Sequence, residues 1–94
     1  MPQLRYSAGA KEDLKQIAAY IAQDKPIAAR KWVAKLREKC RLIATHPDIG
    51  DDRPEFGDGI RGSYLGSYVI FFRRTNGILE IVRVIRGDLD TRSL

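Results

Sequence analysis

The chain has 94 residues, of which 44% are hydrophobic and 31% are charged, and its formal net charge is +5. This size suits a single domain with one core, spanning residues 1–94. The one cysteine cannot form an internal disulfide, and no stretch approaches the roughly 20 apolar residues that span a bilayer. These features exclude a disulfide-stapled scaffold and a transmembrane protein, and we expect a cytoplasmic location without membrane contact.

The charge is unevenly distributed along the chain. Residues 1–45 carry a net charge of +6, residues 46–59 carry −4, and residues 60–94 carry +3. A basic surface of this kind suits an acidic partner, which can be a nucleic acid or an acidic protein segment. The charge alone does not choose between these two partners.

Two helices are predicted in the first half of the chain, over residues 8–23 and 26–45, after a short alternating segment at residues 3–6 that can add an edge strand. Ser7 is the expected N-cap of the first helix, and Pro26 is well placed in the first turn of the second. The first apolar stripe consists of Leu14, Ile17, Ala18 and Ile21. Since the linker is short, the two helices are expected to form an antiparallel hairpin.

The second predicted helix carries a basic face opposite its apolar stripe. Its cations are Arg30, Lys31, Lys35, Arg37, Lys39 and Arg41. This face is either an ordinary solvated surface or a secondary contact surface for phosphates or an acidic protein. No Gly-rich loop or interleaved stacking aromatics accompany it.

Three strands are predicted in the second half of the chain, over residues 60–65, 68–74 and 78–86, because these runs are rich in β-branched and aromatic residues. Gly66-Ser67 and Thr75-Asn76-Gly77 separate them as hairpin-sized breaks. The predicted order is therefore β-α-α-β-β-β. The fold class is α+β, with the two-helix antiparallel hairpin packed on one face of a small antiparallel sheet.

The segment between the second helix and these strands, residues 46–59, is predicted to be a loop because it holds two prolines, three glycines and five acidic residues. Ile49 and Phe56 are expected to anchor it at the edge of the core. The spacing of its acidic residues does not match a calcium-binding loop, so no metal site is predicted.

The second face of the predicted sheet also needs a cover. Residues 68–72 are five consecutive apolar or aromatic side chains, which point alternately to both faces. The helices cover one face. The other is either the moderately apolar surface that every small domain has or, as we favour, a surface that a separate polypeptide covers.

Few residues qualify as catalysts. His46 lies at a predicted helix end beside Pro47, where a capping or exposed role is favoured. Cys40 falls on the apolar stripe, where a buried, inert thiol is expected. No nucleophile triad, paired metal ligands, P-loop or dinucleotide fingerprint is present. We therefore predict no catalytic residue, no metal and no cofactor.

Arg83 is the most informative of the five arginines on or beside the predicted strands. It is flanked by Val82 and Val84, and a charge in the middle of a strand requires an anion. Partner carboxylates or phosphates could supply it from outside the chain. The candidates within the chain are Glu80, Asp88 and Asp90.

The order and spacing of these features resemble the ParE branch of the RelE/ParE superfamily of toxins, over nearly the whole chain. The residues that carry the resemblance are Asp13-Leu14, Ile17 and Tyr20-Ile21, then Pro26-Ile27-Ala28-Ala29, His46-Pro47, Gly50, Gly59-Ile60-Arg61, Tyr68-Val69-Ile70-Phe71-Phe72-Arg73, Gly77, Glu80-Ile81, Arg83-Val84-Ile85 and Gly87. The family's fold is the one predicted above. One departure is Arg86-Gly87 followed by acidic residues, where many relatives have His-Gly and then a basic residue.

The resemblance implies a toxin that a ParD-like antitoxin neutralises and that inhibits DNA gyrase when free, in plasmid stabilisation or a stress response. It implies an inhibitor rather than an enzyme, with operator DNA contacted only through the antitoxin. We expect antitoxin contacts at Arg61, Tyr64, Tyr68, Phe71 and Arg83. Target contacts are expected at Arg86, Asp88, Leu89 and Arg92.

The RelE branch, whose members cut messenger RNA on the ribosome, is the alternative. That chemistry needs a general acid or base and cations around the reacting phosphate. The segment before Arg61 lacks a lysine, Gly87-Asp88 replaces the arginine typical of that branch, and no tyrosine follows in residues 89–94. These differences argue against a ribonuclease. A third hypothesis is a basic nucleic-acid-binding module that uses the second helix.

Overall fold

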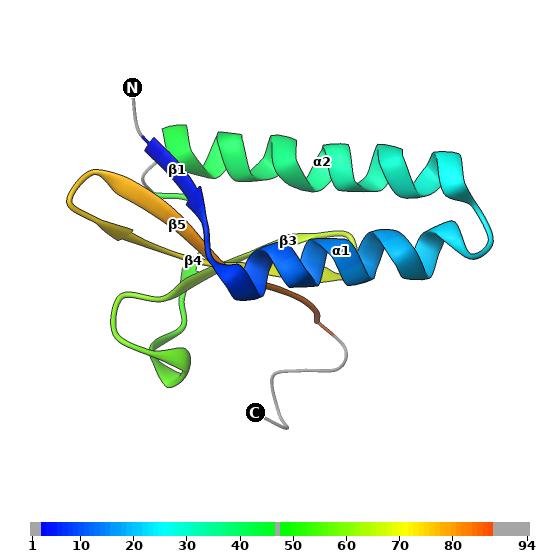
Figure 1. Ribbon diagram of the computed structural model, residues 1–94. Helices are drawn as coiled ribbons and strands as arrows, with labels where there is room; N and C mark the ends of the chain where they lie inside the picture. The colour runs from blue at the N-terminus through cyan, green and yellow to red at the C-terminus, as the bar shows by residue number, and fades with distance from the viewer. Residues whose placement is uncertain (1–2, 47, 88–94) are drawn as a thin grey trace.

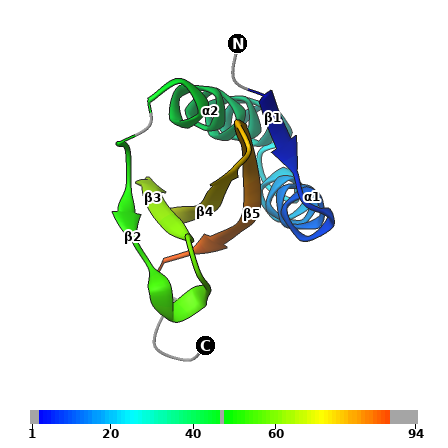
Figure 2. The same ribbon diagram turned by 90° about the vertical axis from the view of Figure 1, so that its left-hand side faces the viewer.

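The computed structural model describes residues 3–46 and 48–87 of the chain. The elements run in the order β1 (Gln3–Tyr6), α1 (Ala8–Ala22), α2 (Pro26–Thr45), β2 (Asp51–Asp52), the short 3-10 helix η1 (Pro54–Phe56), β3 (Arg61–Leu65), β4 (Tyr68–Thr75) and β5 (Ile78–Arg86). The strands form one sheet in the order β1-β5-β4-β3-β2. Figure 1 shows the two helices side by side as an antiparallel pair, and Figure 2 shows them on one side of the sheet.

The predicted α+β fold, with a helical hairpin on one face of the sheet, is confirmed. β1 is an edge strand, as expected, and it pairs with β5 in parallel. The remaining neighbours are antiparallel, so the sheet is mixed. No helix in the described segments is both long and apolar enough to cross a bilayer.

A side chain fixes one end of each helix. Ser7 is the N-cap of α1, as predicted: its Oγ accepts from the Ala10 N–H at 3.0 Å and donates to the Val82 carbonyl at 2.7 Å. At the C-terminus of α2, Arg74 from β4 donates to the carbonyls of Ile43 and His46. A cation at this end also suits the helix dipole.

The main core lies between the helices and the sheet. Leu36 and Ile43 of α2 are fully buried against Phe72 of β4 and Ile81 of β5. Burying such a side chain contributes about 1.5–3 kcal/mol each. Cys40 is buried in this core, as predicted, and its burial raises the pKa of the thiol. The hairpin is therefore held on the sheet by apolar contacts.

A second, smaller core lies on the opposite face of the sheet. Val69 and Phe71 of β4 are buried there with Ile60, and the Phe56 ring lies 4.9 Å from that of Phe71. The cover of this face is the chain's own segment between α2 and β3. The hypothesis that a separate polypeptide covers these residues is therefore wrong, because a loop can bury apolar side chains without being a helix.

Arg61 fastens this covering segment to β3. Its guanidinium donates to the Gly50 carbonyl at 2.7 Å, to the Ile49 carbonyl at 3.3 Å and to Asp52 at 2.9 Å. The segment predicted as a plain loop thus contains the short strand β2 and the helix η1. The expected anchoring by Ile49 and Phe56 is confirmed, since Ile49 packs on the main core and Phe56 on the second.

Candidate functional site

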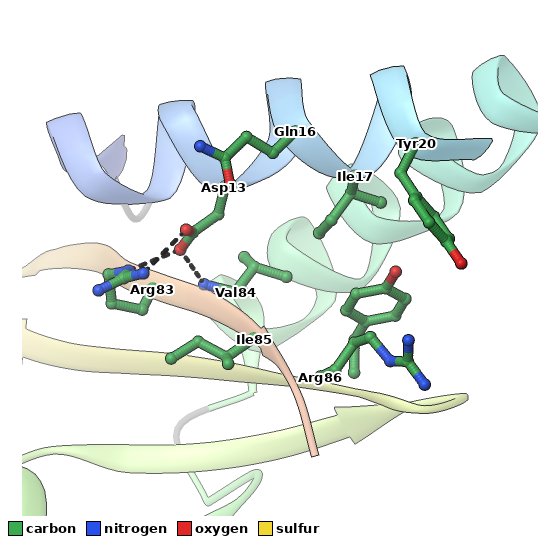
Figure 3. Close-up of a pocket in the computed structure, with 9 residues that line it drawn as sticks. Asp13, Gln16, Ile17, Tyr20, Arg83, Val84, Ile85 and Arg86 are labelled. Carbon is green, nitrogen blue, oxygen red and sulfur yellow. Dashed lines mark hydrogen bonds and ion pairs between the residues drawn. The ribbon is translucent and has the colours of Figure 1, made fainter. Parts of the chain in front are cut away.

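The candidate site lies where β5 extends past β1. β1 pairs with β5 only from Ile78 to Ile81, whereas β5 continues to Arg86. Beyond Ile81, α1 lies beside this edge of the strand in place of another strand. A groove of about 320 Å³ opens between the two elements, as Figure 3 shows. Its lining residues are Asp13, Gln16, Ile17, Tyr20, Tyr68, Arg83, Val84, Ile85 and Arg86.

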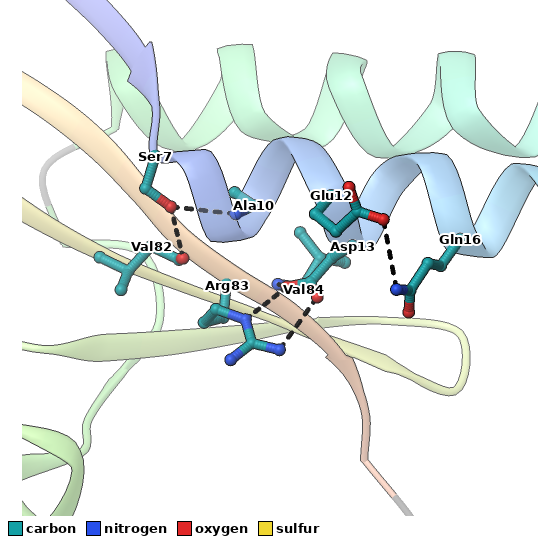
Figure 4. A network of polar contacts seen from close by, with 8 residues as sticks. All are labelled: Ser7, Ala10, Glu12, Asp13, Gln16, Val82, Arg83 and Val84. Carbon is teal, nitrogen blue, oxygen red and sulfur yellow. Dashed lines mark hydrogen bonds and ion pairs between the residues drawn. The ribbon is translucent and has the colours of Figure 1, made fainter.

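Asp13 of α1 joins the helix to the strand at one end of this β5-edge groove. Its carboxylate accepts from Arg83 Nε at 2.7 Å and from Arg83 Nη2 at 3.0 Å, a bidentate arrangement. It also accepts from the Val84 backbone N–H at 2.9 Å (Figure 4). The carboxylate therefore takes the place of a carbonyl from a neighbouring strand.

The sequence analysis did not identify this partner of Arg83. Glu80 pairs instead with Arg73 at 3.1 Å, and Asp88 and Asp90 lie outside the described residues. A β-bulge contributes to the difference: Phe72 pairs with Ile81 but Phe71 pairs with Arg83, so β5 holds one extra residue. A bulge breaks the strand's simple alternation and re-aims side chains, which a period of two cannot predict.

Arg83 is fixed in position and still accessible. Its side chain remains 51% exposed, whereas that of Asp13 is only 11% exposed. Hydrogen bonding to Asp13 raises the pKa of Arg83, so the guanidinium stays charged. Gly9 leaves room for the arginine stem, because a Cβ there would lie 3.0 Å from Arg83 Cδ. Arg83 is therefore a pre-positioned cation at the mouth of the groove.

Apart from Gln16 and Arg86, the remaining side chains that line the groove are apolar or aromatic. Ile17 and Ile85 line its wall, and Tyr20 of α1 is 66% exposed at its rim. Tyr68 is half-buried beside it and packs against Trp32, with ring centroids 6.0 Å apart. Aromatic side chains beside a cation are typical of surfaces that bind another protein tightly.

Comparisons with known proteins give the family. Residues 4–90 match the family model described as the ParE toxin of the type II toxin–antitoxin system, parDE. Toxin ParE1 of Caulobacter vibrioides is 31% identical over 94 residues, covering 99% of this chain and 97% of that protein. The chain belongs to the ParE toxin family.

Solved structures agree with this assignment of the ParE fold. A chain of the chromosomal ParDE system from P. aeruginosa superposes with a TM-score of 0.78 at 25% identity, covering 92% of this chain and 96% of that one. A chain of the toxin–antitoxin complex RelBE2 from Mycobacterium tuberculosis gives a TM-score of 0.67 at 21% identity, covering 92% and 99%. The second likeness shows the fold alone.

The antitoxin contacts expected for a ParE toxin do not form one surface. Tyr68 and Arg83 line the β5-edge groove together. Tyr64 lies on the opposite face of the sheet, since it pairs with Val69 of the second core. Phe71 is buried in that core, and Arg61 fastens the covering segment. The groove therefore brings together two of the five residues.

The expected target contacts are only partly placed. Arg86 lies at the end of β5 and lines the same groove. Asp88, Leu89 and Arg92 lie outside the described residues.

Sequence analysis missed three groove residues on α1: Asp13, Gln16 and Tyr20. Their spacing of three and four residues places them on one face of the helix, next to the apolar stripe. The signal for this site in the sequence was Tyr20, a tyrosine at the border of the apolar stripe. The partner strand, however, could not be inferred from this spacing.

Proposed function

We propose that a ParD-like antitoxin neutralises this ParE-family toxin, and that the free toxin inhibits DNA gyrase in the bacterial cytoplasm. The family match and the ParE1 relative support the toxin assignment. The likeness to the ParDE system supports an antitoxin of the ParD kind. In this proposal the toxin is an inhibitor rather than an enzyme, and it meets operator DNA only through its antitoxin.

The observation that carries the antitoxin proposal is the β5-edge groove. The Val84 N–H points toward α1. Because the N–H and the carbonyl of one residue in a strand point to the same side, the Val84 carbonyl faces this edge too. An extended antitoxin segment can lie along this edge, with apolar side chains against Ile17 and Ile85. A carboxylate of that segment can bind Arg83. Since Asp13 already holds Arg83, little side-chain entropy is lost on binding.

The first experiment tests the target. The purified chain, freed of antitoxin, is incubated with gyrase, ATP and supercoiled plasmid, and the DNA is examined after denaturant and protease treatment. We expect linear DNA to accumulate and to disappear when the antitoxin is added. A folded protein that arrests growth but yields no cleaved DNA would contradict the gyrase proposal. Messenger RNA bound to the ribosome is then the substrate to test, as for the RelE branch.

The second experiment tests the groove, using two exposed tyrosines on opposite faces. Tyr20 is 66% exposed and lines the groove, whereas Tyr64 is 57% exposed and does not. Tyr20→Ala should weaken antitoxin binding by roughly tenfold or more, as truncation of an interface aromatic does. Tyr64→Ala should leave it within about twofold, as expected for a side chain outside the interface. Titration calorimetry measures the antitoxin affinity of both variants. Equal affinities would show that the antitoxin does not bind in the groove.

A further inference from the structure

The excess positive charge of this chain is concentrated on helix α2. The helix carries six Lys and Arg residues and a single acidic residue, Glu38, which gives it a net charge of +5. The whole chain also has a formal net charge of +5, so the other residues together are neutral. Glu38 is itself paired with Arg41 at 2.6 Å. The remaining cations of α2 therefore have no acidic neighbour left on their own helix.

Three lysines form a stripe along one side of α2, which runs beside α1 in Figure 1. Lys31, Lys35 and Lys39 are four residues apart, a spacing that places side chains above one another on a helix. The α2 residues that line the cleft between the two helices are Pro26, Ala29, Arg30, Val33, Ala34 and Arg37. The three lysines therefore lie on the side of α2 that faces away from α1. We call them the lysine stripe.

The lysine stripe is available to an anion from outside the chain. Lys31 and Lys35 are exposed, and Lys39 is half-buried. None of the ion pairs among the described residues involves a lysine of the stripe. Lys35 Nζ lies 6.0 Å from the centre of the Trp32 ring, at the outer limit of a cation–π contact, so the ring holds this ammonium group only weakly.

The length of the lysine stripe suits a phosphate backbone. Since an α-helix rises about 1.5 Å per residue, the stripe extends about 12 Å from Lys31 to Lys39. One strand of duplex DNA carries a phosphate every 3.4 Å or so along the axis, so this length spans roughly three to four phosphates. Each lysine is a compact point charge, which can bind a phosphate oxygen beside any base pair.

An acidic protein segment fits the lysine stripe less well than DNA does. Lysine is depleted in protein–protein interfaces, whereas tyrosine and arginine, which line the β5-edge groove, are enriched there. Leu42 is 44% exposed and lies next to the stripe, one turn after Lys39. A single exposed leucine is ordinary at a protein surface and does not form an apolar patch. The stripe thus offers cations without the apolar anchors that a protein partner uses.

We propose that the lysine stripe binds the phosphate backbone of duplex DNA, and that it does so on the DNA segment that gyrase holds. The second part rests on the proposed function. A toxin that contacts both gyrase and its DNA binds more tightly than through either contact alone, because the second contact becomes intramolecular. Phosphate contacts read no sequence, so recognition of the operator still belongs to the antitoxin. None of the three lysines lines the β5-edge groove, so the antitoxin contact proposed above is separate.

The test compares two triple variants of equal charge. The stripe variant carries Lys31→Gln, Lys35→Gln and Lys39→Gln. The control variant carries the same change at three exposed lysines outside α2: Lys11→Gln, Lys15→Gln and Lys25→Gln. Each triple change removes three positive charges, so both variants have a formal net charge of +2 in place of +5. A difference between them therefore reflects the position of the charges rather than their sum.

DNA binding is measured by fluorescence anisotropy, with a labelled duplex of arbitrary sequence, over a range of salt concentrations. The stripe variant should bind roughly tenfold or more weakly than the unmodified chain, and the slope of log K against log salt should fall by about 3, one for each lost phosphate contact. The control variant should stay within about threefold in affinity, with a slope change below about 1.

Thermal unfolding checks that each variant is folded. Because Lys39 is half-buried, the double change Lys31→Gln/Lys35→Gln, at two exposed positions, repeats the test if the triple variant does not fold. Its matched control is Lys11→Gln/Lys15→Gln.

The gyrase cleavage assay tests where the lysine stripe acts. The concentration of the chain that gives half-maximal linear DNA should rise roughly tenfold or more for the stripe variant, since one of two linked contacts is lost. It should stay within about twofold for the control variant. The antitoxin affinity of the stripe variant should remain within about twofold of the native value, as expected for side chains outside that interface.

The outcomes separate this inference from the proposed function. Equal DNA affinities of the two variants would overturn the inference and leave gyrase inhibition standing. So would a stripe variant that yields linear DNA at the concentration that the unmodified chain needs. If the unmodified chain yields no linear DNA, gyrase inhibition fails together with the second part of the inference, and the anisotropy comparison still decides whether the stripe binds DNA. Loss of antitoxin affinity in the stripe variant, or tighter binding of the unmodified chain to duplex RNA than to duplex DNA, would assign the stripe to another partner and overturn the inference.

Discussion

At the scale of single residues, Asp13 has the largest structural role in the candidate site. Its carboxylate accepts three hydrogen bonds, two from Arg83 and one from the Val84 N–H. These bonds join α1 to a strand about 70 positions later in the chain. They also occupy the Val84 N–H, so an extended partner segment on this edge can bond only to the Val84 carbonyl.

Replacing Asp13 with Asn should therefore lower the free energy of unfolding by about 1–3 kcal/mol, the cost of leaving a buried donor without an acceptor. An amide has the shape of the carboxylate but presents one oxygen where the native side chain presents two, so it cannot satisfy all three donors. Urea denaturation followed by circular dichroism measures the change.

A neighbouring acidic residue provides the control for this substitution. Glu12 is exposed and contacts Gln16 at 3.3 Å. Glu12→Gln should change the stability by less than about 0.5 kcal/mol, as exposed substitutions do. If the two variants were equally stable, the Asp13 contacts would not stabilise the fold.

At the scale of elements, the two hairpin turns differ in how strongly they need glycine. Both glycines have positive φ, 59° at Gly66 and 78° at Gly77. A Cβ on Gly66 would lie 2.8 Å from the Trp32 ring, whereas a Cβ on Gly77 would meet nothing within 4 Å. The turn at Gly66 therefore needs glycine for its backbone conformation and for packing against Trp32. The turn at Gly77 needs glycine for its backbone conformation alone.

Alanine substitutions at these two turns should separate the two constraints. Gly77→Ala is expected to cost about 1–2 kcal/mol for the left-handed backbone. Gly66→Ala should cost more, by roughly 1–3 kcal/mol, since the indole must also move. Denaturant unfolding of both variants measures the difference. A smaller loss at Gly66 would show that Trp32 can shift freely.

At the scale of the whole molecule, each face of the sheet carries a core that other parts of the same chain cover. The helical hairpin covers one face, and the segment that contains β2 and η1 covers the other. Arg53 adds to this second cover, since its guanidinium lies 5.1 Å from the Phe56 ring centroid and 5.6 Å from that of Phe71. The fold is thus complete without an antitoxin on this second core.

Removing the main apolar contact of this cover should destabilise the fold. Phe56→Ala is expected to lower the free energy of unfolding by about 1–3 kcal/mol, less than for a fully buried phenylalanine because this ring is half-buried. Asp58→Ala, at an exposed position in the same segment, should change it by less than about 0.5 kcal/mol. Thermal unfolding, monitored through the binding of an apolar dye, measures the stability of both variants. Equal stabilities would mean that the segment does not cover the second core.

The sequence by itself determined the local structure and the family. The Ser7 cap, the helices around Pro26 and the three consecutive strands lie where they were predicted, within one residue or so at each end. The Asn76-Gly77 turn has positive φ at both positions, as its residues demand. These signals are local, since caps, turns and apolar periodicity depend on residues within a few positions of one another. The resemblance to ParE toxins likewise rests on residue order and is confirmed.

Only the tertiary structure decided which distant residues meet. The parallel pairing of β1 and the bonds from Asp13 to Arg83 join segments far apart in the chain. So does the cover of Phe71 by Phe56. Residue spacing carries no information on which anion an arginine reaches across such a distance, because that depends on how the elements pack. The β5-edge groove is a product of this packing, so it could not be located from the sequence.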